Sequence, residues 1–425
     1  MIFTTTSTPK RTQRSALSAI CLTRLVLLAV AVGVVPASAE DWPTYRKDIH
    51  CGGVTSEQLA LPLASGWRHT TARAPSPAWT ESPAAHDYLH EHYDLKQRQN
   101  FDGCFHVAVV GKRVYFGSSV SGALTCLDAE SGNEVWTFFT DGPIRLAPTV
   151  ADGRVYFGSD DGLVYCLDAD DGSVVWQQRA GPSAHKMWGN ERMISVWPVR
   201  SSVLVDGGDV FWTAGVLATE GMFFCKRNAL DGSGGWTVTP ARPHQGYLVA
   251  TARHVIAPSG KTSPAMYRRD DGRHEGDLRK AHRGGSWVLV TADESGVFSG
   301  PTLDNATHQF DPVRRTVVAS APGANCLVVD QAGIYYNTDS NIAALARADR
   351  SKLWSSDLVC PFALIKAGNH LFAGGDGEVQ ALNAATGDSV WNAPVDGRSL
   401  GLAVANRALY VSTDRGSIHC FRAGR

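Results

Sequence analysis

The chain is dominated by a repeat with a period near 40 residues. Two neighbouring stretches, 114–136 (VYFGSSVSGALTCLDAESGNEVW) and 155–176 (VYFGSDDGLVYCLDADDGSVVW), match each other closely, and looser copies follow. Aligned on one position near the start of each copy, the units begin at Tyr115, Tyr156, Phe211, Val255, Phe298, Tyr335, Phe372 and Tyr410. Self-similarity at this period is typical of a propeller or a solenoid.

Each unit has the same order of strands and turns. An alternating apolar strand leads to a short turn rich in Asp and Gly. A second strand, such as LVYCLDA at 163–169, leads to another Gly turn and to a third strand that ends in Trp. Period-2 alternation between such turns predicts a β-meander. A fourth strand is expected between units, which completes the four-stranded antiparallel sheet of a propeller blade.

Eight unit starts predict an all-β, eight-bladed β-propeller, and the last unit indicates how the ring closes. In complete units a Trp follows the aligned residue by 19–25 residues, so the last unit needs one beyond Arg425. Trp67, in LPLASGWRHTTA at 61–72, is the candidate for the missing outer strand. The N-terminal segment would then complete the last blade and remove a free edge, which would otherwise promote aggregation. An open array with separate caps is the alternative.

The second half of each unit carries a pattern that is found in a known family. The stretches LDAESGNEVW (127–136), LDADDGSVVW (167–176) and LNAATGDSVW (382–391) carry it well. They resemble the tryptophan-docking repeats of the quinoprotein-type, PQQ-like and BamB-like β-propeller family. DWPTYRKD at 41–48 is similar to the start of many exported members. The resemblance covers nearly all of the chain after residue 39 and constrains the fold more than the function.

The first 39 residues have the three parts of a secretory signal peptide. Residues 10–24 carry four basic residues and no acidic one, residues 25–35 (LVLLAVAVGVV) are apolar, and Ala37-Ser38-Ala39 precedes Glu40. The apolar run is shorter than the ~20 residues that span a bilayer. We therefore expect cleavage after Ala39, a periplasmic or extracellular protein, and no transmembrane segment in the mature chain. An uncleaved membrane anchor is the alternative.

The mature chain is weakly acidic and long enough for one large domain. Without the four basic residues of the leader, 36 Lys and Arg stand against 41 Asp and Glu, a net charge of −5. Nucleic-acid binding rests on a basic surface, so no nucleic acid is expected. We assign residues 40–425 to a single propeller domain with an insertion at 73–104, and we expect a monomer.

Eight cysteines follow residue 39, an even number that in an exported protein invites a disulfide interpretation. Four of them share one repeat position, where another unit has Ala381: Cys126, Cys166, Cys225 and Cys420. Equivalent positions in different blades cannot come within the ~7 Å Cα limit for a disulfide. These four are therefore predicted to pack as small buried residues. A link between Cys51 and Cys104 stays open, and the pairing of Cys326 and Cys360 is not assigned.

Two sets of residues invite a metal interpretation. In the insertion, His86 and His90 could share a helix face with His92 nearby, but no recognised zinc spacing or further ligand completes a site. Solvated histidines are the preferred interpretation. The acidic turn DADDG at 168–172 places its Gly at position 5, whereas an EF-hand loop needs it at position 6. Its counterparts DAESG and NAATG show that the turn is needed and the charge is not.

The strongest candidate for a binding site is the long loop at 180–202, together with nearby turns. Propellers bind ligands on loops around the channel mouth. The pair Asp160-Asp161 is not required by the repeat, since its counterparts are Ser119-Val120 and Gly375-Asp376, and Glu220 lies in the turn of the next unit. The predicted ligand- or partner-binding residues are Asp160, Asp161, Asn190, Arg192, Trp197, Arg200 and Glu220. The alternative is that Arg192 and Arg200 only pair with neighbouring turn aspartates.

The sequence contains no motif that assigns a reaction. It has no G-x-S-x-G, H-E-x-x-H or P-loop pattern, and no C-x-x-C-H haem site. PQQ-dependent dehydrogenases of the resembling family use a vicinal Cys-Cys pair and a calcium held by Glu, Asn and Asp, and no two cysteines are adjacent here. We therefore predict no catalytic, cofactor or metal residues. PQQ with calcium, or another oxidoreductase or hydrolase site at the channel mouth, is the alternative.

The function predicted from the sequence is that of an exported, non-catalytic binding or scaffold protein. Its expected partner is a protein or a glycan of the cell envelope, met through the loops of one face. The family resemblance implies assistance in outer-membrane assembly. No cysteine follows the predicted cleavage site, so the sequence provides no lipid attachment.

Overall fold

The computed structural model describes residues 39–79, 100–260, 262–278, 284–302 and 305–424. Residues 1–38 of the leader and the histidines of the insertion (His86, His90 and His92) lie outside these ranges. The compact unit Ala37–Arg425 consists of β-sheet, and within the described ranges a single 3-10 turn, Ala218–Glu220, is the only helical element. None of the described helical segments could cross a membrane. The chain is all-β, as its alternation pattern predicts.

Six of the repeats fold as separate four-stranded antiparallel sheets whose neighbouring strands are consecutive in the chain. The first three contain β3 (Val107–Val110), β4 (Arg113–Gly117), β5 (Ala123–Asp128) and β6 (Glu134–Phe139); β7 (Thr149–Ala151), β8 (Arg154–Gly158), β9 (Leu163–Asp168) and β10 (Val174–Arg179); and β13 (Leu204–Asp206), β14 (Asp209–Ala214), β15 (Phe223–Asn228) and β16 (Trp236–Val238). The next three contain β17 (Val249–Ala250), β18 (His254–Ala257), β19 (Ala265–Arg268) and β20 (His274–Asp277); β21 (Gly284–Val290), β22 (Val297–Thr302), β23 (Ala306–Phe310) and β24 (Val317–Pro322); and β25 (Cys326–Val329), β26 (Gly333–Asn337), β27 (Ile342–Ala346) and β28 (Lys352–Ser356).

The last two repeats share the long strand β32 (Ser389–Ala405) and form one eight-stranded sheet. Its strands are β1 (Val54–Thr55), β29 (Ala363–Ala367), β30 (His370–Gly374), β31 (Asp376–Asn383), β32, β33 (Ala408–Thr413), β34 (Ser417–Ala423) and β2 (Leu63–Thr70). The prediction for Trp67 is confirmed, because β2 pairs with β34 and places Trp67 opposite Cys420. The N-terminal region thus supplies the outer strand of the last repeat.

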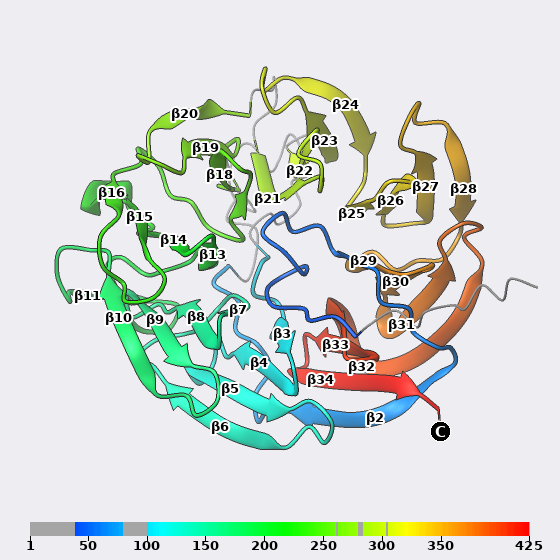
Figure 1. The fold of residues 1–425 in the computed structure, drawn as a ribbon, viewed down its shortest axis with the longest axis horizontal. Helices are drawn as coiled ribbons and strands as arrows, with labels where there is room; N and C mark the ends of the chain where they lie inside the picture. Colours follow the sequence, from blue (N-terminus) through cyan, green and yellow to red (C-terminus); the bar gives the residue numbers. More distant parts are fainter. Residues whose placement is uncertain (1–38, 80–99, 261, 279–283, 303–304, 425) are drawn as a thin grey trace, which may run out of the picture. The chain divides into compact units, whose positions relative to one another are not determined.

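The sheets follow one another in chain order, with the first strand of each on the inside and the fourth on the outside, as β3 and β6 show in Figure 1. Inner strands of neighbouring sheets are in contact, for example β3 with β7 and β25 with β29, and β32 contacts β3. Apolar side chains of adjacent sheets share buried clusters. One cluster joins Tyr115 and Leu124 of the first sheet to Phe157 and Leu167 of the second. Packing between sheets therefore forms the core.

A tryptophan on the outer strand of one sheet docks on the next sheet. The indole Nε1 of Trp136 donates to the carbonyl oxygen of Ala169 at 3.2 Å. A Cβ at Gly172, which has a φ of +75°, would lie 2.7 Å from the indole, so the ring requires glycine beneath it. The same Nε1 bond to a backbone carbonyl is made by Trp67, Trp176, Trp236, Trp354 and Trp391. The motif of the repeats is therefore a contact between sheets.

The N-terminal segment 42–55 runs along the inner strands of six sheets, where Figure 1 shows it as a blue trace. Trp42 exchanges backbone hydrogen bonds with Val109 of β3 at 2.7 and 2.8 Å. Arg46 donates to the carbonyl oxygens of Leu327 in β25 at 2.6 Å and Leu364 in β29 at 3.0 Å. Carbonyl oxygens of the segment accept the backbone N–H groups of Val150 (β7), Ala250 (β17), Val290 (β21) and Lys366 (β29). This short segment therefore bonds to sheets from almost the whole chain.

Candidate functional site

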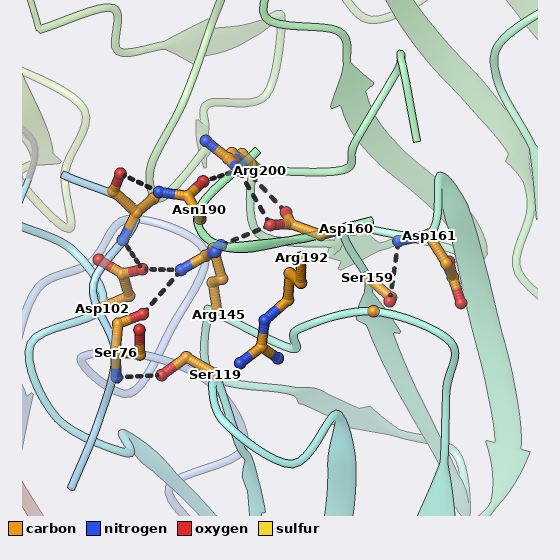
Figure 2. A network of polar contacts seen from close by, with 12 residues as sticks. Ser76, Asp102, Ser119, Arg145, Ser159, Asp160, Asp161, Asn190, Arg192 and Arg200 are labelled. Carbon is orange, nitrogen blue, oxygen red and sulfur yellow. Dashed lines mark hydrogen bonds and ion pairs between the residues drawn. The ribbon is translucent and has the colours of Figure 1, made fainter. Parts of the chain in front are cut away.

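Two of the predicted site residues, Asp160 and Arg200, meet in a buried ion network (Figure 2). The carboxylate of Asp160, in the turn between β8 and β9, accepts hydrogen bonds from Arg200 Nε and Nη2, both at 3.0 Å. It also accepts one from Arg145 Nε at 2.7 Å. Arg145 Nη1 donates to Asp102 Oδ2 at 2.8 Å. All four side chains are at most 4% exposed, so the charges neutralise one another away from water.

The two carboxyl groups of this network differ in acidity. Burial favours the neutral form of Asp160, but Arg200 and Arg145 outweigh it and hold the pKa of Asp160 below its ordinary value. Burial raises the pKa of Asp102 above its ordinary value, although Arg145 opposes the rise. Oδ1 of Asp102 has no hydrogen-bond partner among the described residues. Asp160 is therefore the anion that holds the two arginines together.

Asn190 extends the network to the loop at 180–202. Its Oδ1 accepts Arg200 Nη2 at 2.7 Å, and its Nδ2 donates to the carbonyl oxygen of Ala78, also at 2.7 Å. Asn190 and Glu191 both have positive φ, 52° and 60°, as the two central residues of a type I′ hairpin turn require. This turn joins β11 (Lys186–Gly189) to β12 (Arg192–Ser195). The buried ion network therefore fixes the tip of an irregular hairpin.

The same network holds residues at both ends of the insertion 73–104. Asp102 Oδ2 accepts the backbone N–H of Ala78 at 2.8 Å, and Arg145 Nη1 donates to the carbonyl oxygen of Ser76 at 2.9 Å. Ser76 N–H in turn donates to Ser119 Oγ at 3.0 Å. Residues from both ends of the insertion are thereby tied to the first two sheets.

The other predicted residues make separate contacts. Arg192 donates to the carbonyl oxygen of Val120 at 2.9 Å. Trp197 is buried, and its Nε1 donates to the backbone carbonyl of Glu220 at 2.7 Å, while Glu220 itself is exposed. Asp161 is buried and accepts the hydroxyl of Tyr165 at 2.7 Å. The structure thus brings Asp160, Asn190 and Arg200 together, and it gives Asp161 and Trp197 contacts within the fold.

The hairpin surface formed by Trp188 and Met193 was not among the sites predicted from the sequence. These two residues pair directly across β11 and β12. Trp188 is 72% exposed and Met193 is 48% exposed. The stretch KMWGNERM at 186–193 contains the signal that could have identified it, because a polar two-residue turn stands between two short strand-like runs. Asp102 and Arg145 were also missed, and neither belongs to a recognisable motif.

The buried ion network does not suit a calcium ion. Within the described ranges, no three His, Cys, Asp or Glu side chains lie together as metal ligands. The buried carboxylates Asp102 and Asp160 already face two arginines, whose positive charge opposes a cation.

All eight described cysteines are free thiols, so Cys51 and Cys104 are not linked. The four cysteines at the shared repeat position are fully buried, as predicted.

The buried histidine His244 predicts a pH dependence of stability. Burial, with Arg242 as the next cause, lowers the pKa of His244 from 6.5 to about 4. As the pH falls, the unfolded chain therefore takes up a proton before the folded chain does. The contribution of neutral His244 to the free energy of unfolding is complete above the pKa of the unfolded state. It is lost as the pH falls towards 4, for a total of about 3 kcal/mol. Urea unfolding at a series of pH values should show this loss.

The variant His244→Gln isolates this contribution. It should show a shallower loss of stability between neutral pH and pH 4 than the unmodified chain, because the unfolded-state proton uptake is removed. The exposed His185 supplies a matched control, His185→Gln. An unchanged pH profile in His244→Gln would contradict the assignment.

Comparison with known proteins places the chain among PQQ-repeat proteins. The family model for the outer membrane protein assembly factor BamB matches residues 65–196, 158–292 and 338–423. No curated protein matches the chain. Similar solved structures are the quinohemoprotein alcohol dehydrogenase from Comamonas testosteroni (14% identity, 91% of this chain and 81% of that chain, TM-score 0.64) and a europium-containing methanol dehydrogenase (10%, 91% and 99%, TM-score 0.63). A third is the computationally designed protein Ika8 (13%, 76% and 96%, TM-score 0.58). At these identities the structures show the shared propeller fold alone.

Proposed function

Because the chain belongs to the BamB-like family of PQQ-repeat proteins, we propose that it is a non-catalytic scaffold protein of the cell envelope. It binds a protein partner through the β11–β12 hairpin and assists in outer-membrane assembly. The observation that supports this proposal is the hairpin surface, where Trp188 and Met193 are exposed on a hairpin that the buried ion network holds in place.

The chemistry of the hairpin surface suits a protein partner. Tryptophan is enriched among the residues that dominate binding energies, and methionine adapts to irregular apolar surfaces. The bonds of Asn190 to Arg200 and Ala78 order the hairpin before binding, which lowers the entropic cost of association. Among the described strands, β11 and β12 pair only with each other. On the outer edge of β12, the N–H of Ser195 already donates to the carbonyl oxygen of Asp160 at 2.7 Å. The outer edge of β11 is therefore the one that can accept an extended segment of a partner by strand addition.

An envelope location is supported by family membership and by the leader-like sequence. The family model describes an outer membrane assembly factor. Residues 1–39 carry the predicted signal peptide, of which residues 1–38 lie outside the described residues, so cleavage after Ala39 remains a prediction. A protein partner in the periplasm is the partner class that we propose, and a glycan is the competing outcome of the experiment.

The variant Trp188→Ala/Met193→Ala tests the hairpin surface. In cells that produce the chain, cross-linking should capture an envelope protein with the unmodified chain, and the variant should lose more than about tenfold of this capture. Both side chains are exposed, so the melting temperature should not fall. The matched control is Val313→Ala, whose side chain is 85% exposed in another repeat.

Three outcomes would contradict the proposal. Equal capture by the variant and the control would show that another surface binds the partner. Protection of the hairpin by a glycan alone would replace the protein partner. Cofactor absorbance with alcohol-dependent dye reduction, after incubation with PQQ and calcium, would identify an enzyme instead.

A further inference from the structure

Two junctions between sheets lack both the docking tryptophan and the glycine that lies beneath it at Gly132, Gly172, Gly232, Gly272 and Gly387. On β10, Trp176 lies opposite Cys166, just after a shift in register. The outer strands of the fourth and fifth sheets have other residues at the position of this tryptophan. In β20 it is Gly276, opposite Met266, and in β24 it is Ala319, opposite Gln309. The indole is therefore missing where the fourth sheet meets the fifth and where the fifth meets the sixth.

Arginine replaces the glycine of the receiving turn at both junctions. The N–H of Gly172 bonds to the carbonyl oxygen four residues earlier, and Arg315 and Arg350 make the same bond to Asp311 and Ala346. Arg315 and Arg350 also have positive φ, 59° and 61°. An indole over these turns would collide with any Cβ, as the glycine geometry shows. Loss of the tryptophan therefore removes the requirement for glycine, and a long side chain becomes possible.

The two junctions differ in what fills the space that an indole occupies at the other junctions. At the first, the guanidinium of Arg315 lies over Gly276, 2.6 Å from where a Cβ would stand, and donates to the carbonyl oxygen of Glu275. At the second, Arg350 reaches only to Gln309 Oε1. A cavity of about 240 Å³ remains there, lined mainly by apolar side chains that include Phe298, Ala319, Leu327 and Leu345, with Gln309 and Arg350 among the polar ones.

We propose that this cavity between the fifth and sixth sheets binds a flat bicyclic aromatic acid. A cavity of about 150 Å³ lined by apolar side chains takes up benzene, so this one has room for a second ring. The missing indole defines a flat site between the two sheets. Arg350 carries five N–H donors, and its Nη2 donates to Gln309 Oε1. The remaining donors suit a carboxylate on the rim of the ring.

The site is independent of the hairpin surface. It is formed by β22 to β27 and the turn that carries Arg350, whereas the hairpin lies between the second and third sheets in the chain. Indole-3-acetate and indole are suitable probes, because they share the ring and differ in the carboxylate. Titration calorimetry of the full chain should show saturable binding of indole-3-acetate, with weaker binding of indole.

Introducing the docking tryptophan and its glycine should fill the cavity and prevent ligand binding. The double variant Ala319→Trp/Arg350→Gly supplies the indole and the glycine found at the other junctions, and it should lose more than about tenfold in affinity for indole-3-acetate. Its melting temperature should rise, since the cavity is filled. The matched control is Val318→Trp, which adds an indole to the adjacent exposed position and should leave binding unchanged.

The variant Arg350→Gln tests the acid selectivity. It should weaken the binding of indole-3-acetate by about tenfold and leave the affinity for indole unchanged, because only the acid bonds to the guanidinium. Absence of saturable binding of both probes by the unmodified chain would overturn the proposal. Unchanged affinity of Ala319→Trp/Arg350→Gly for indole-3-acetate would overturn it as well.

Discussion

Replacement of Arg145 by alanine is expected to lower the free energy of unfolding by about 3–5 kcal/mol. Arg145 bonds to both Asp102 and Asp160, and its loss leaves these two buried carboxylates with Arg200 as their only described cationic partner. Removing one member of a buried ion network is costly because an uncompensated charge stays out of water. Urea denaturation at neutral pH measures the difference directly.

The matched control for Arg145→Ala is an exposed ion pair. Arg268 pairs with Asp270 at the surface, and Arg268→Ala should leave the urea midpoint of unfolding nearly unchanged. A loss below 1 kcal/mol in Arg145→Ala would show that the network contributes no more than the surface pair. We also expect Arg145→Ala to reduce partner capture, because Asp160 and Arg200 hold Asn190 and the hairpin in place.

The repeat predicted the fold well because its signals are local. Alternation and Gly turns indicate strands within each unit, and the Trp at the end of a unit shows where its outer strand lies. Trp67 was found in this way although its partner strand is more than 300 residues away in the chain. The same reasoning placed four cysteines in the core, because a repeat position that also accepts Ala381 must be buried and small.

The site could be predicted only in part, because its partners come from separate loops. Asp160 was singled out since other units lack it, and Arg200 and Asn190 since they lie in the longest loop. Their connection through Arg145, and its link to Asp102, depends on how the loops of neighbouring sheets meet. No spacing along the chain encodes that meeting. Trp197, from the same loop, is buried and donates to the carbonyl oxygen of Glu220, a contact that its position in the sequence does not indicate.

The path of the segment 42–55 was also invisible in the sequence, and Trp42 is its most buried anchor. Trp42 is 1% exposed and packs in the cluster shared by the first sheet and the last two repeats. Trp42→Ala should therefore lower the free energy of unfolding by about 3–5 kcal/mol, through the lost burial and the cavity left behind. The matched control is Lys47→Ala on the same segment, whose ion pair with Glu40 is partly exposed and should contribute at most about 1 kcal/mol.

Hydrogen exchange separates a local cavity from release of the whole segment. The N–H of Val150 donates to the carbonyl of Pro43, beside Trp42, whereas the N–H of Val290 donates to that of His50 farther along. If the segment is held as one unit, Trp42→Ala should accelerate exchange at both amides, because loss of the anchor frees every carbonyl that follows. Faster exchange at Val150 alone would show that Arg46, through its bonds to Leu327 and Leu364, anchors the rest independently. A fall in stability below 1 kcal/mol with both amides unchanged would contradict an anchoring role for Trp42.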